Sequence, residues 1–416
     1  MLEIETKVQR YERYKESGIS WLEAVPEHWE LKRFKHIFKE KKITHNVALN
    51  CGSISFGKVV YKDDEKVPVS TKKSYQVLNK GEFLINPLNL NYDLISLRIG
   101  LSDKDVVVSS GYIIVQNDTE LSKDYYKWLL HIFDIAFMKT LGSGVRQTLS
   151  FTHIANSELV FPPLSEQTAI AQFLDDKTTK IDAAITIKQQ QISLLKERKQ
   201  ILIHKAVTRG LDENVELKDS GEEWIGEIPV HWELKRFKFL ATSNKGKLPN
   251  KIESINDDNL PPYMSMDYLR GGEGNQWVKD KDAFIIDENE ILLLWDGSNS
   301  GEFLKSRKGV ISSTVAHIIF SNINKDFAWY HSMVLEIELR KNTIGMGIPH
   351  VNGRVLNNLA MLLPPFSEQK EIVDYLDDGT KKIETAISLK QQEIEKLKEY
   401  KNSLINSVVT GKVKVC

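Results

Sequence analysis

The chain repeats its own sequence once, and this duplication constrains its fold more than any other feature. Residues 17–38 read SGISWLEAVPEHWELKRFKHIF, and residues 220–241 read SGEEWIGEIPVHWELKRFKFLA. A second pair lies further along each half, where PPLSEQ at 162–167 is echoed by PPFSEQ at 364–369. A period of about two hundred residues is far too long for a solenoid. The sequence therefore predicts two similar halves, and its 416 residues are enough for each half to bury its own core.

Each half has the same internal order. It opens with a Trp-Pro-His-Trp segment, continues with short apolar runs bounded by Gly, Asn and Asp, and closes with a long helical pattern. Short apolar runs between turn residues are typical of β-strands. We expect strands within residues 67–70, 82–86 and 106–115 of the first half, and within 290–295 and 310–319 of the second.

The closing segments carry clear helix signals. Pro163 and Pro365 cannot continue an earlier element, and the Ser-Glu pair soon after each supplies a capping oxygen and early negative charge. Gly210 and Gly411 mark the expected helix ends. Between these limits a heptad stripe predicts a helix-pair seam. The stripe comprises Ile181, Ile185, Lys188, Ile192, Leu195, Lys199, Leu202 and Ala206, then Ile383, Ile387, Lys390, Ile394, Leu397, Lys401, Leu404 and Val408.

Two similar stripes in one chain are expected to pair with each other. We predict an α+β fold of two similar mixed α/β domains separated by two long helices, which pack as an antiparallel coiled coil with internal pseudo-two-fold symmetry. The lysines within the seam either extend to acidic groups or set the register, and the sequence leaves both open. The expected domains are 1–162, the central helix 163–210, the second mixed domain 211–363 and the C-terminal helix 364–416.

The composition and the motifs favour a chain that has no catalytic activity of its own. The 56 basic and 57 acidic residues balance to a net charge of −1, which is not the basic signature of a nucleic-acid-binding domain. No phosphate-cradling loop occurs, ten histidines show no ligand spacing, and two cysteines cannot form a zinc site, so no catalytic or metal residue is expected. No apolar run approaches the ~20 residues of a membrane span, and a soluble, cytoplasmic protein is expected.

One short motif, which occurs twice, is similar to a catalytic motif of DNA methyltransferases. DNA amino-methyltransferases carry Asn/Asp-Pro-Pro-aromatic, whose polar first side chain holds the target amino group. This chain has LPPY at 260–263 and LPPF at 363–366, where leucine cannot make that hydrogen bond. Both motifs are therefore interpreted as structural.

Together, Trp-x-x-x-x-Pro-x-His-Trp opening each half and Pro-Pro-x-Ser-Glu-Gln leading into each helix resemble the specificity subunit of type I restriction–modification systems. The resemblance covers nearly the whole chain. It implies a non-catalytic subunit whose two target-recognition domains read an asymmetric bipartite site in double-stranded DNA. It also implies that the helices dock two methyltransferase subunits and, through them, restriction subunits. No cofactor is expected on this chain, and S-adenosylmethionine, ATP and Mg are expected in those partners.

Two other functions remain open at this stage. The chain could be a self-contained DNA methyltransferase or restriction enzyme, or a coiled-coil scaffold that binds protein. Methyl transfer by the purified chain alone would support an enzyme. Failure to bind any DNA, even with a methyltransferase partner, would support a scaffold.

Candidate DNA-binding residues lie in loops that differ between the halves where the surrounding sequence agrees. Arg and Gln side chains pair bidentately with guanine and adenine edges, which makes Arg146 and Gln147 the first choices, although ordinary polar loops would look the same. The full set is Tyr92, Arg98, Arg146, Gln147, Ser298, Asn299, His350 and Asn352. The repeated helix starts give the candidate partner-docking residues, with helix capping as the alternative; they are Glu166, Gln167, Glu368 and Gln369. Charge reversal at the two glutamates is expected to reduce partner stoichiometry and leave the fold intact.

Overall fold

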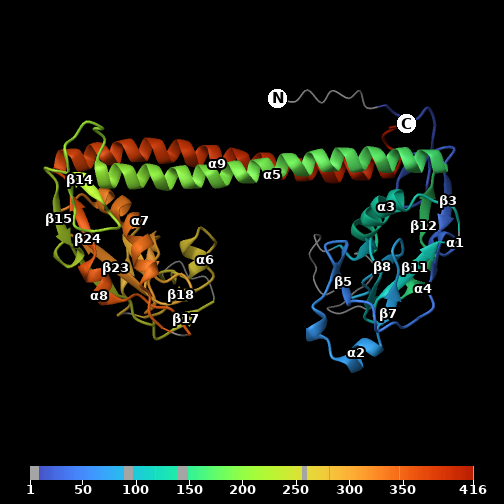
Figure 1. The fold of residues 1–416 in the computed structure, drawn as a ribbon, viewed down its shortest axis with the longest axis horizontal. Helices are drawn as coiled ribbons and strands as arrows, with labels where there is room; N and C mark the ends of the chain where they lie inside the picture. Colours follow the sequence, from blue (N-terminus) through green and yellow to red (C-terminus); the bar gives the residue numbers. More distant parts are fainter. Residues whose placement is uncertain are drawn as a thin grey trace. The chain divides into compact units, whose positions relative to one another are not determined.

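A computed structural model describes residues 9–88, 97–117, 119–138, 149–254, 260–280, 282–345 and 347–415. The chain divides into two compact units (Figure 1). The first unit comprises Met1–Lys188 and Gln392–Cys416, and the second comprises Gln189–Gln391. The two long helices, α5 (Leu164–Arg209) and α9 (Phe366–Val409), each contribute one part to each unit.

The first unit is built on a four-stranded antiparallel sheet in the order β4-β11-β8-β9, as far as the structure describes it. Paired strands β1-β2, β3-β12, β5-β6 and β7-β10 surround this sheet. The strands are β1 (Tyr14–Glu16), β2 (Ala24–Pro26), β3 (Glu30–Arg33), β4 (Phe38–Glu40), β5 (Gly52–Ser55), β6 (Lys58–Tyr61), β7 (Gln76–Leu78), β8 (Phe83–Ile85), β9 (Ile99–Leu101), β10 (Val106–Val108), β11 (Ile113–Asn117) and β12 (Glu158–Phe161). The helices are α1 (Phe34–Ile37), α2 (Val69–Lys73), α3 (Lys123–Ala136) and α4 (Phe151–Ala155), with a 3-10 turn η1 (Asp64–Lys66).

The second unit repeats this topology. Its central sheet has the order β16-β23-β20-β21, and β13-β14, β15-β24, β17-β18 and β19-β22 pair around it within the described residues. The strands are β13 (Leu217–Asp219), β14 (Glu227–Pro229), β15 (Glu233–Arg236), β16 (Ala241–Lys245), β17 (Ile252–Glu253), β18 (Trp277–Val278), β19 (Ile285–Ile286), β20 (Ile291–Leu294), β21 (Phe303–Lys305), β22 (Gly309–Val310), β23 (Val315–Phe320) and β24 (Ala360–Leu363). The helices are α6 (Met266–Leu269), α7 (Lys325–Lys341) and α8 (Gly353–Asn358), with a 3-10 turn η3 (Phe237–Phe239).

The predicted seam between the long helices is present in both units. In the first unit Lys188 Nζ lies 2.6 Å from Glu393 Oε2, and Lys401 Nζ lies 2.7 Å from Asp182 Oδ1. From the first pair to the second, the residue number on α5 falls from 188 to 182 while that on α9 rises from 393 to 401. The two helices therefore run antiparallel there. In the second unit Lys199 Nζ lies 2.5 Å from Glu384 Oε1. These three lysine side chains are 24% or 25% exposed and extend to carboxylates of the opposite helix, which is one of the two roles that the sequence left open.

Each unit closes its core with the end of one long helix and the start of the other. In the first unit α3 packs against the central sheet, and the cluster also takes in Ile170 and Leu174 from α5 and Ile405 and Val408 from α9. The second unit has the same arrangement around α7, with apolar residues from the end of α5 and the start of α9; they are Ile203, Ala206, Val207, Ile372, Val373 and Leu376. The α+β fold predicted from the duplication is therefore confirmed.

One expected strand is wrong. The stretch at residues 67–70 leads into α2, which begins at Val69 with Pro68 at its N-cap. Proline is compatible with a helix start because it has no N–H to leave unpaired, so the β-branched residues here were misleading. No helix in the described ranges is long and apolar enough to cross a membrane.

Candidate nucleic-acid interface and helix junctions

A partly buried carboxylate joins the start of α5 to the Trp-Pro-His-Trp segment of the first unit. Glu166 accepts hydrogen bonds from Trp29 Nε1 at 3.0 Å and from Tyr11 OH at 2.8 Å, and His28 Nε2 lies 2.6 Å from its other oxygen. Partial burial raises the pKa of Glu166, but the hydrogen bonds from Trp29, His28 and Tyr11 outweigh it and hold the pKa below its usual value. The repeated motif thus encodes a joint between a domain and a helix.

The second unit contains the same joint. Glu368 at the start of α9 accepts from Trp232 Nε1 at 3.0 Å, and His231 Nε2 lies 2.8 Å from the same oxygen. The joint also meets the end of the antiparallel helix. A Cβ on Gly210, which has a φ of +75°, would lie 3.2 Å from Trp232 Cζ2. Gly411 has a φ of +77°, and a Cβ on it would lie 2.9 Å from Trp29 Cη2 in the first unit, as expected for the glycines that end these helices.

The neighbouring glutamines make a second, fully buried link. Gln167 Oε1 accepts from Ser122 N at 2.8 Å, and its Nε2 donates to Pro162 O at 2.8 Å. Gln369 does the same with Asn324 N at 2.7 Å and Pro364 O at 2.8 Å. Ser122 and Asn324 are the N-caps of α3 and α7, so each glutamine fixes the start of that helix to the long helix.

These contacts correct part of the docking hypothesis. Gln167 and Gln369 are 0% and 2% exposed, so neither amide is open to a partner subunit. Glu166 and Glu368 have acceptor roles inside their own units, so reversing their charge should not leave the fold intact. The sequence could not show this, because each carboxylate meets donors well over a hundred positions away along the chain.

We expect Glu166→Ala to lower the free energy of unfolding of the first unit by about 2–4 kcal/mol, because three buried or half-buried donors lose their acceptor. The folded-state pKa of Glu166 is depressed, so its contribution is present above the unfolded pKa and is lost as the pH falls through the folded pKa. Hydrogen exchange of β11 and β23 measures the two units separately. Glu368→Ala is the matched control and should affect β23 instead; equal loss in both units would contradict local joints.

In the second unit the structure brings the two predicted recognition loops together. One loop follows β20 and contains Ser298 and Asn299, and the other precedes α8 and contains His350 and Asn352. They are joined by hydrogen bonds from Gly297 N to Pro349 O at 2.9 Å and from Val351 N to Trp295 O at 2.8 Å. Residues separated by some fifty positions in the sequence therefore share one surface.

The four side chains in these loops differ in how available they are for contacts with DNA bases. Ser298 is exposed, and Asn299 and His350 are partly exposed. Asn352 caps α8, because its Oδ1 accepts from Arg354 N at 3.1 Å and from Val355 N at 3.4 Å. Its oxygen is thus already used, which leaves Ser298, Asn299 and His350 as the better candidates for base contacts.

The corresponding loops of the first unit meet in the same way at their flanks. Leu149 N donates to Pro87 O at 3.0 Å, which joins the segment after β8 to the segment before α4. Tyr92, Arg146 and Gln147 lie outside the described residues. Arg98 is described, and it corrects a prediction: its side chain is 5% exposed and donates from Nε to Asp134 Oδ1 at 2.9 Å. A buried guanidinium that is paired in this way is not presented to DNA bases.

Two acidic residues, which were not identified from the sequence, accept backbone hydrogen bonds where the chain leaves the first recognition loop of each unit. Asp134 on α3 also accepts from Arg98 N at 2.5 Å, immediately before β9. Glu336, at the same position on α7, accepts from Phe303 N at 3.2 Å at the start of β21. Both acids lie at the same distance from the Lys-Asp pair that begins their helix, a signal that an alignment of the halves could have found.

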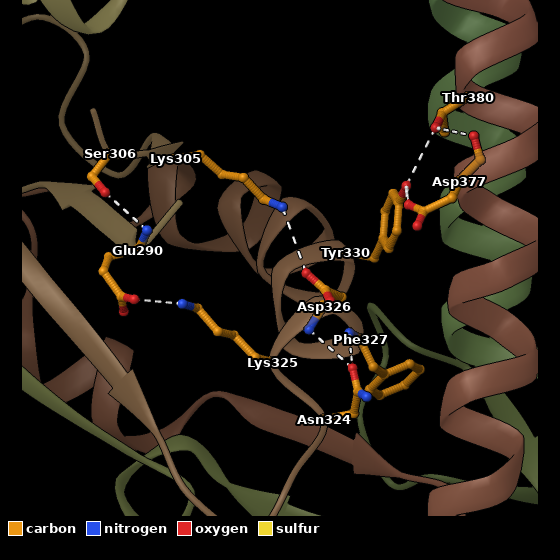
Figure 2. Close-up of polar contacts among 10 residues, drawn as sticks. All are labelled: Glu290, Lys305, Ser306, Asn324, Lys325, Asp326, Phe327, Tyr330, Asp377 and Thr380. Atoms are coloured by element: carbon orange, nitrogen blue, oxygen red, sulfur yellow. Dashed lines mark hydrogen bonds and ion pairs between the residues drawn. The ribbon is translucent and has the colours of Figure 1, made fainter. Parts of the chain in front are cut away.

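Two polar contacts in the first half of α7 fix this helix in place (Figure 2). Lys325 Nζ lies 2.6 Å from Glu290 Oε1 beside β20, and Tyr330 OH donates to Asp377 Oδ1 of α9 at 2.6 Å. In the first unit Trp128 Nε1 donates to Asp175 Oδ1 at 2.9 Å at the equivalent place. The loops are thus carried by a frame that is tied to the long helices. Within the part of the chain that the structure describes, no group of acids, histidines or cysteines could hold a metal ion.

Comparisons with known proteins find the same domain in each of the two halves. The model of the type I restriction modification DNA specificity domain matches twice, over residues 26–197 and 229–399. The type I restriction enzyme MjaVIII specificity subunit of Methanocaldococcus jannaschii is 36% identical over 186 residues, which are 44% of this chain and 43% of that protein. The chain thus spans less than half of this relative. The putative MjaX specificity subunit of the same organism is 24% identical over 97% of this chain and 98% of that protein.

Solved structures show the same fold. A chain from a structural study of complex assembly and conformational transition of the type I R-M system aligns with a TM-score of 0.71 and 13% identity, over 92% of this chain and 98% of that chain. The HsdS subunit from Thermoanaerobacter tengcongensis aligns with a TM-score of 0.51 and 14% identity, over 96% of this chain and 100% of that chain. The two family matches cover most of the chain and coincide with its two halves, and they confirm the resemblance inferred from the paired motifs. The chain belongs to the family of type I restriction–modification specificity subunits and carries the DNA specificity domain twice.

Proposed function

We propose that this chain is the non-catalytic DNA-recognition subunit of a type I restriction–modification complex, in which each unit reads one half of an asymmetric bipartite site. The observation that carries this proposal is that the same two segments are joined by backbone hydrogen bonds in both units, namely those after β8 and before α4 and those after β20 and before α8. The frame around these segments is repeated down to single hydrogen bonds, such as those that Asp134 and Glu336 accept, whereas the loop sequences differ. A repeated frame with two different reading surfaces suits two unrelated half-sites.

The proposal includes two methyltransferase partners, with restriction subunits joining through them. S-adenosylmethionine, ATP and Mg are assigned to those partners. Support comes from apolar residues on the outer face of α5, where Leu194 is 63% exposed and Ile201 is 60% exposed. They lie one heptad apart and outside the seam, which is the pattern expected for a second helix-packing face. This face replaces the buried glutamines as the docking candidate.

Methylation mapping tests the proposed reading of DNA. Host DNA should carry methylated bases at one bipartite motif when the gene is present and lack them when it is deleted. Methyl transfer by the purified chain alone would favour a self-contained enzyme. Failure to bind any DNA in the presence of the methyltransferase would favour a protein scaffold.

Replacing both Asn299 and His350 with alanine should weaken recognition of one half-site only, at a cost of about 1–3 kcal/mol for each lost base contact. In methylation maps the motif should relax in that half and stay unchanged in the other. Asn402→Ala, on the exposed surface of α9, is the control and should leave the map unchanged. Equal weakening of binding to cognate and random DNA would contradict base reading by these loops.

Replacing Leu194 and Ile201 with glutamate should reduce the number of methyltransferase subunits bound, because charge on an apolar packing face opposes its burial. The residues are exposed in the free chain, so its melting temperature should change little. Native mass spectrometry of the purified complex gives the stoichiometry. Lys196→Glu, between them on the exposed side of α5, controls for charge alone. Unchanged two-to-one assembly would exclude this face.

A further inference from the structure

The hairpin of β5 and β6 in the first unit has an unusual turn. The two strands pair as far as Ser55 and Lys58, which leaves only Phe56 and Gly57 in the loop. Both loop residues have positive φ, 46° for Phe56 and 73° for Gly57. Two-residue turns with positive φ at both positions strongly prefer Asn-Gly, Asp-Gly or Gly-Gly, because a bulky side chain is strained in this conformation.

Within the described residues, burial of the Phe56 side chain does not account for this strained backbone. Its side chain is 69% exposed and belongs to no core cluster. The other described non-glycine residues with positive φ are Asn289 and Asn322, which tolerate it, and Glu23, which forms an ion pair with Lys412. An exposed aromatic ring in a strained turn is a combination that points to a binding role.

The hairpin tip lies against the end of the predicted first recognition loop. A Cβ on Gly57 would be 3.1 Å from Leu97 Cβ, and a Cβ on Gly100 would be 2.7 Å from Gly57 O. The tip therefore contacts the chain where it leaves the Tyr92–Arg98 segment. This packing holds the Phe56–Gly57 turn against the chain at Leu97 and Gly100.

The hairpin that carries Phe56 also bears basic and aromatic side chains. Lys58 is exposed next to the turn, and Tyr61 on the same hairpin is 57% exposed. Lys104 Nζ lies 5.1 Å from the centre of the Tyr61 ring. On duplex DNA, basic side chains contact phosphates, and apolar side chains such as phenylalanine contact base edges, for example the thymine methyl group.

Resting on the proposed function, we propose that Phe56 is a DNA-contacting residue of the first unit, which adds an apolar base contact beside the first recognition loop. It serves one half-site only. At the same place in the second unit, β17 and β18 are joined by a long segment that includes α6, in place of a two-residue turn. The two units thus differ in this second reading element as well as in their loops.

The test is Phe56→Asn, because it separates binding from stability. Asparagine suits the positive φ, so the melting temperature of the first unit should rise. Loss of the ring should weaken binding of the complex with its methyltransferase to cognate DNA by roughly tenfold to a hundredfold, the range typical of one lost base-pair contact. Phe56→Tyr keeps the ring and should bind within about twofold of the unaltered chain. Phe239→Ala, which removes a 66% exposed phenylalanine in the second unit, controls for the loss of a surface ring.

Each outcome bears on one hypothesis. If the unaltered complex binds no DNA, the proposed function fails. If it binds and Phe56→Asn binds equally well, the proposed function stands and this inference is overturned. A lower melting temperature with unchanged DNA binding would assign Phe56 a structural role, and reduced methyltransferase binding with unchanged DNA affinity would assign it to a protein interface.

Discussion

Ile405→Ala should unfold the first unit more easily and leave the second unit unaffected, although Ile405 lies on the second of the two long helices. Its side chain is 1% exposed and belongs to the core of the first unit. Truncating a buried isoleucine to alanine costs about 2–5 kcal/mol, through lost burial and the cavity that remains. Tyr125 OH also donates to Val409 O at 2.9 Å, so the loss should reach α3. Hydrogen exchange of β11, with β23 as the internal reference, measures the difference.

The matched variant is Ile203→Ala, and it should give the opposite pattern. Ile203 lies near the end of α5, is 4% exposed, and belongs to the core of the second unit. β23 should lose protection, and β11 should keep it. Loss of protection in the second unit for Ile405→Ala, in the first unit for Ile203→Ala, or in both units equally would contradict the assignment. The end of each long helix would then not belong to the core given for it here.

Inserting one heptad after Lys196 in α5 and one after Ala386 in α9 should abolish methylation at the native sites. The paired insertions keep the antiparallel register set by Lys199 with Glu384. They lengthen the pair of long helices by about 10 Å at ~1.5 Å per residue. If the helix pair sets the distance between the two half-sites, this length corresponds to about three base pairs. With 10–10.5 base pairs per DNA turn, three base pairs also rotate the groove by roughly 100°, so one half-site would face away.

Three paired heptads provide the control. They add about 31 Å, close to the ~34–36 Å of one DNA turn, so both grooves return to nearly the same face. Methylation should reappear at sites with the same two half-sites and a gap about nine base pairs wider. Continued methylation of native sites after the single insertion would mean that the helices do not set the spacing.

The parts of the fold that follow from repetition could be predicted from the sequence. Two copies of each motif fixed the order of elements, and the heptad stripes located the seam, because packing periodicity is a local signal. The joint between Glu166 and Trp29 was missed because it depends on residues 137 positions apart. Arg98 was mistaken for a base contact for the same reason, since its partner Asp134 lies 36 positions away. Base contacts depend on a docked pose, which no loop sequence specifies.

The division of each long helix between the units has a consequence for synthesis on the ribosome. The second unit is a continuous stretch, Gln189–Gln391, whereas the first needs residues 392–416 to complete its core. The amino-terminal unit is therefore the later of the two to acquire all its parts. At ~5–20 residues per second, its unfinished hydrophobic face stays open for roughly 10–40 s after residue 188 is made. A premature stop shortly before residue 392 would release a chain whose first unit lacks the residues that close its core.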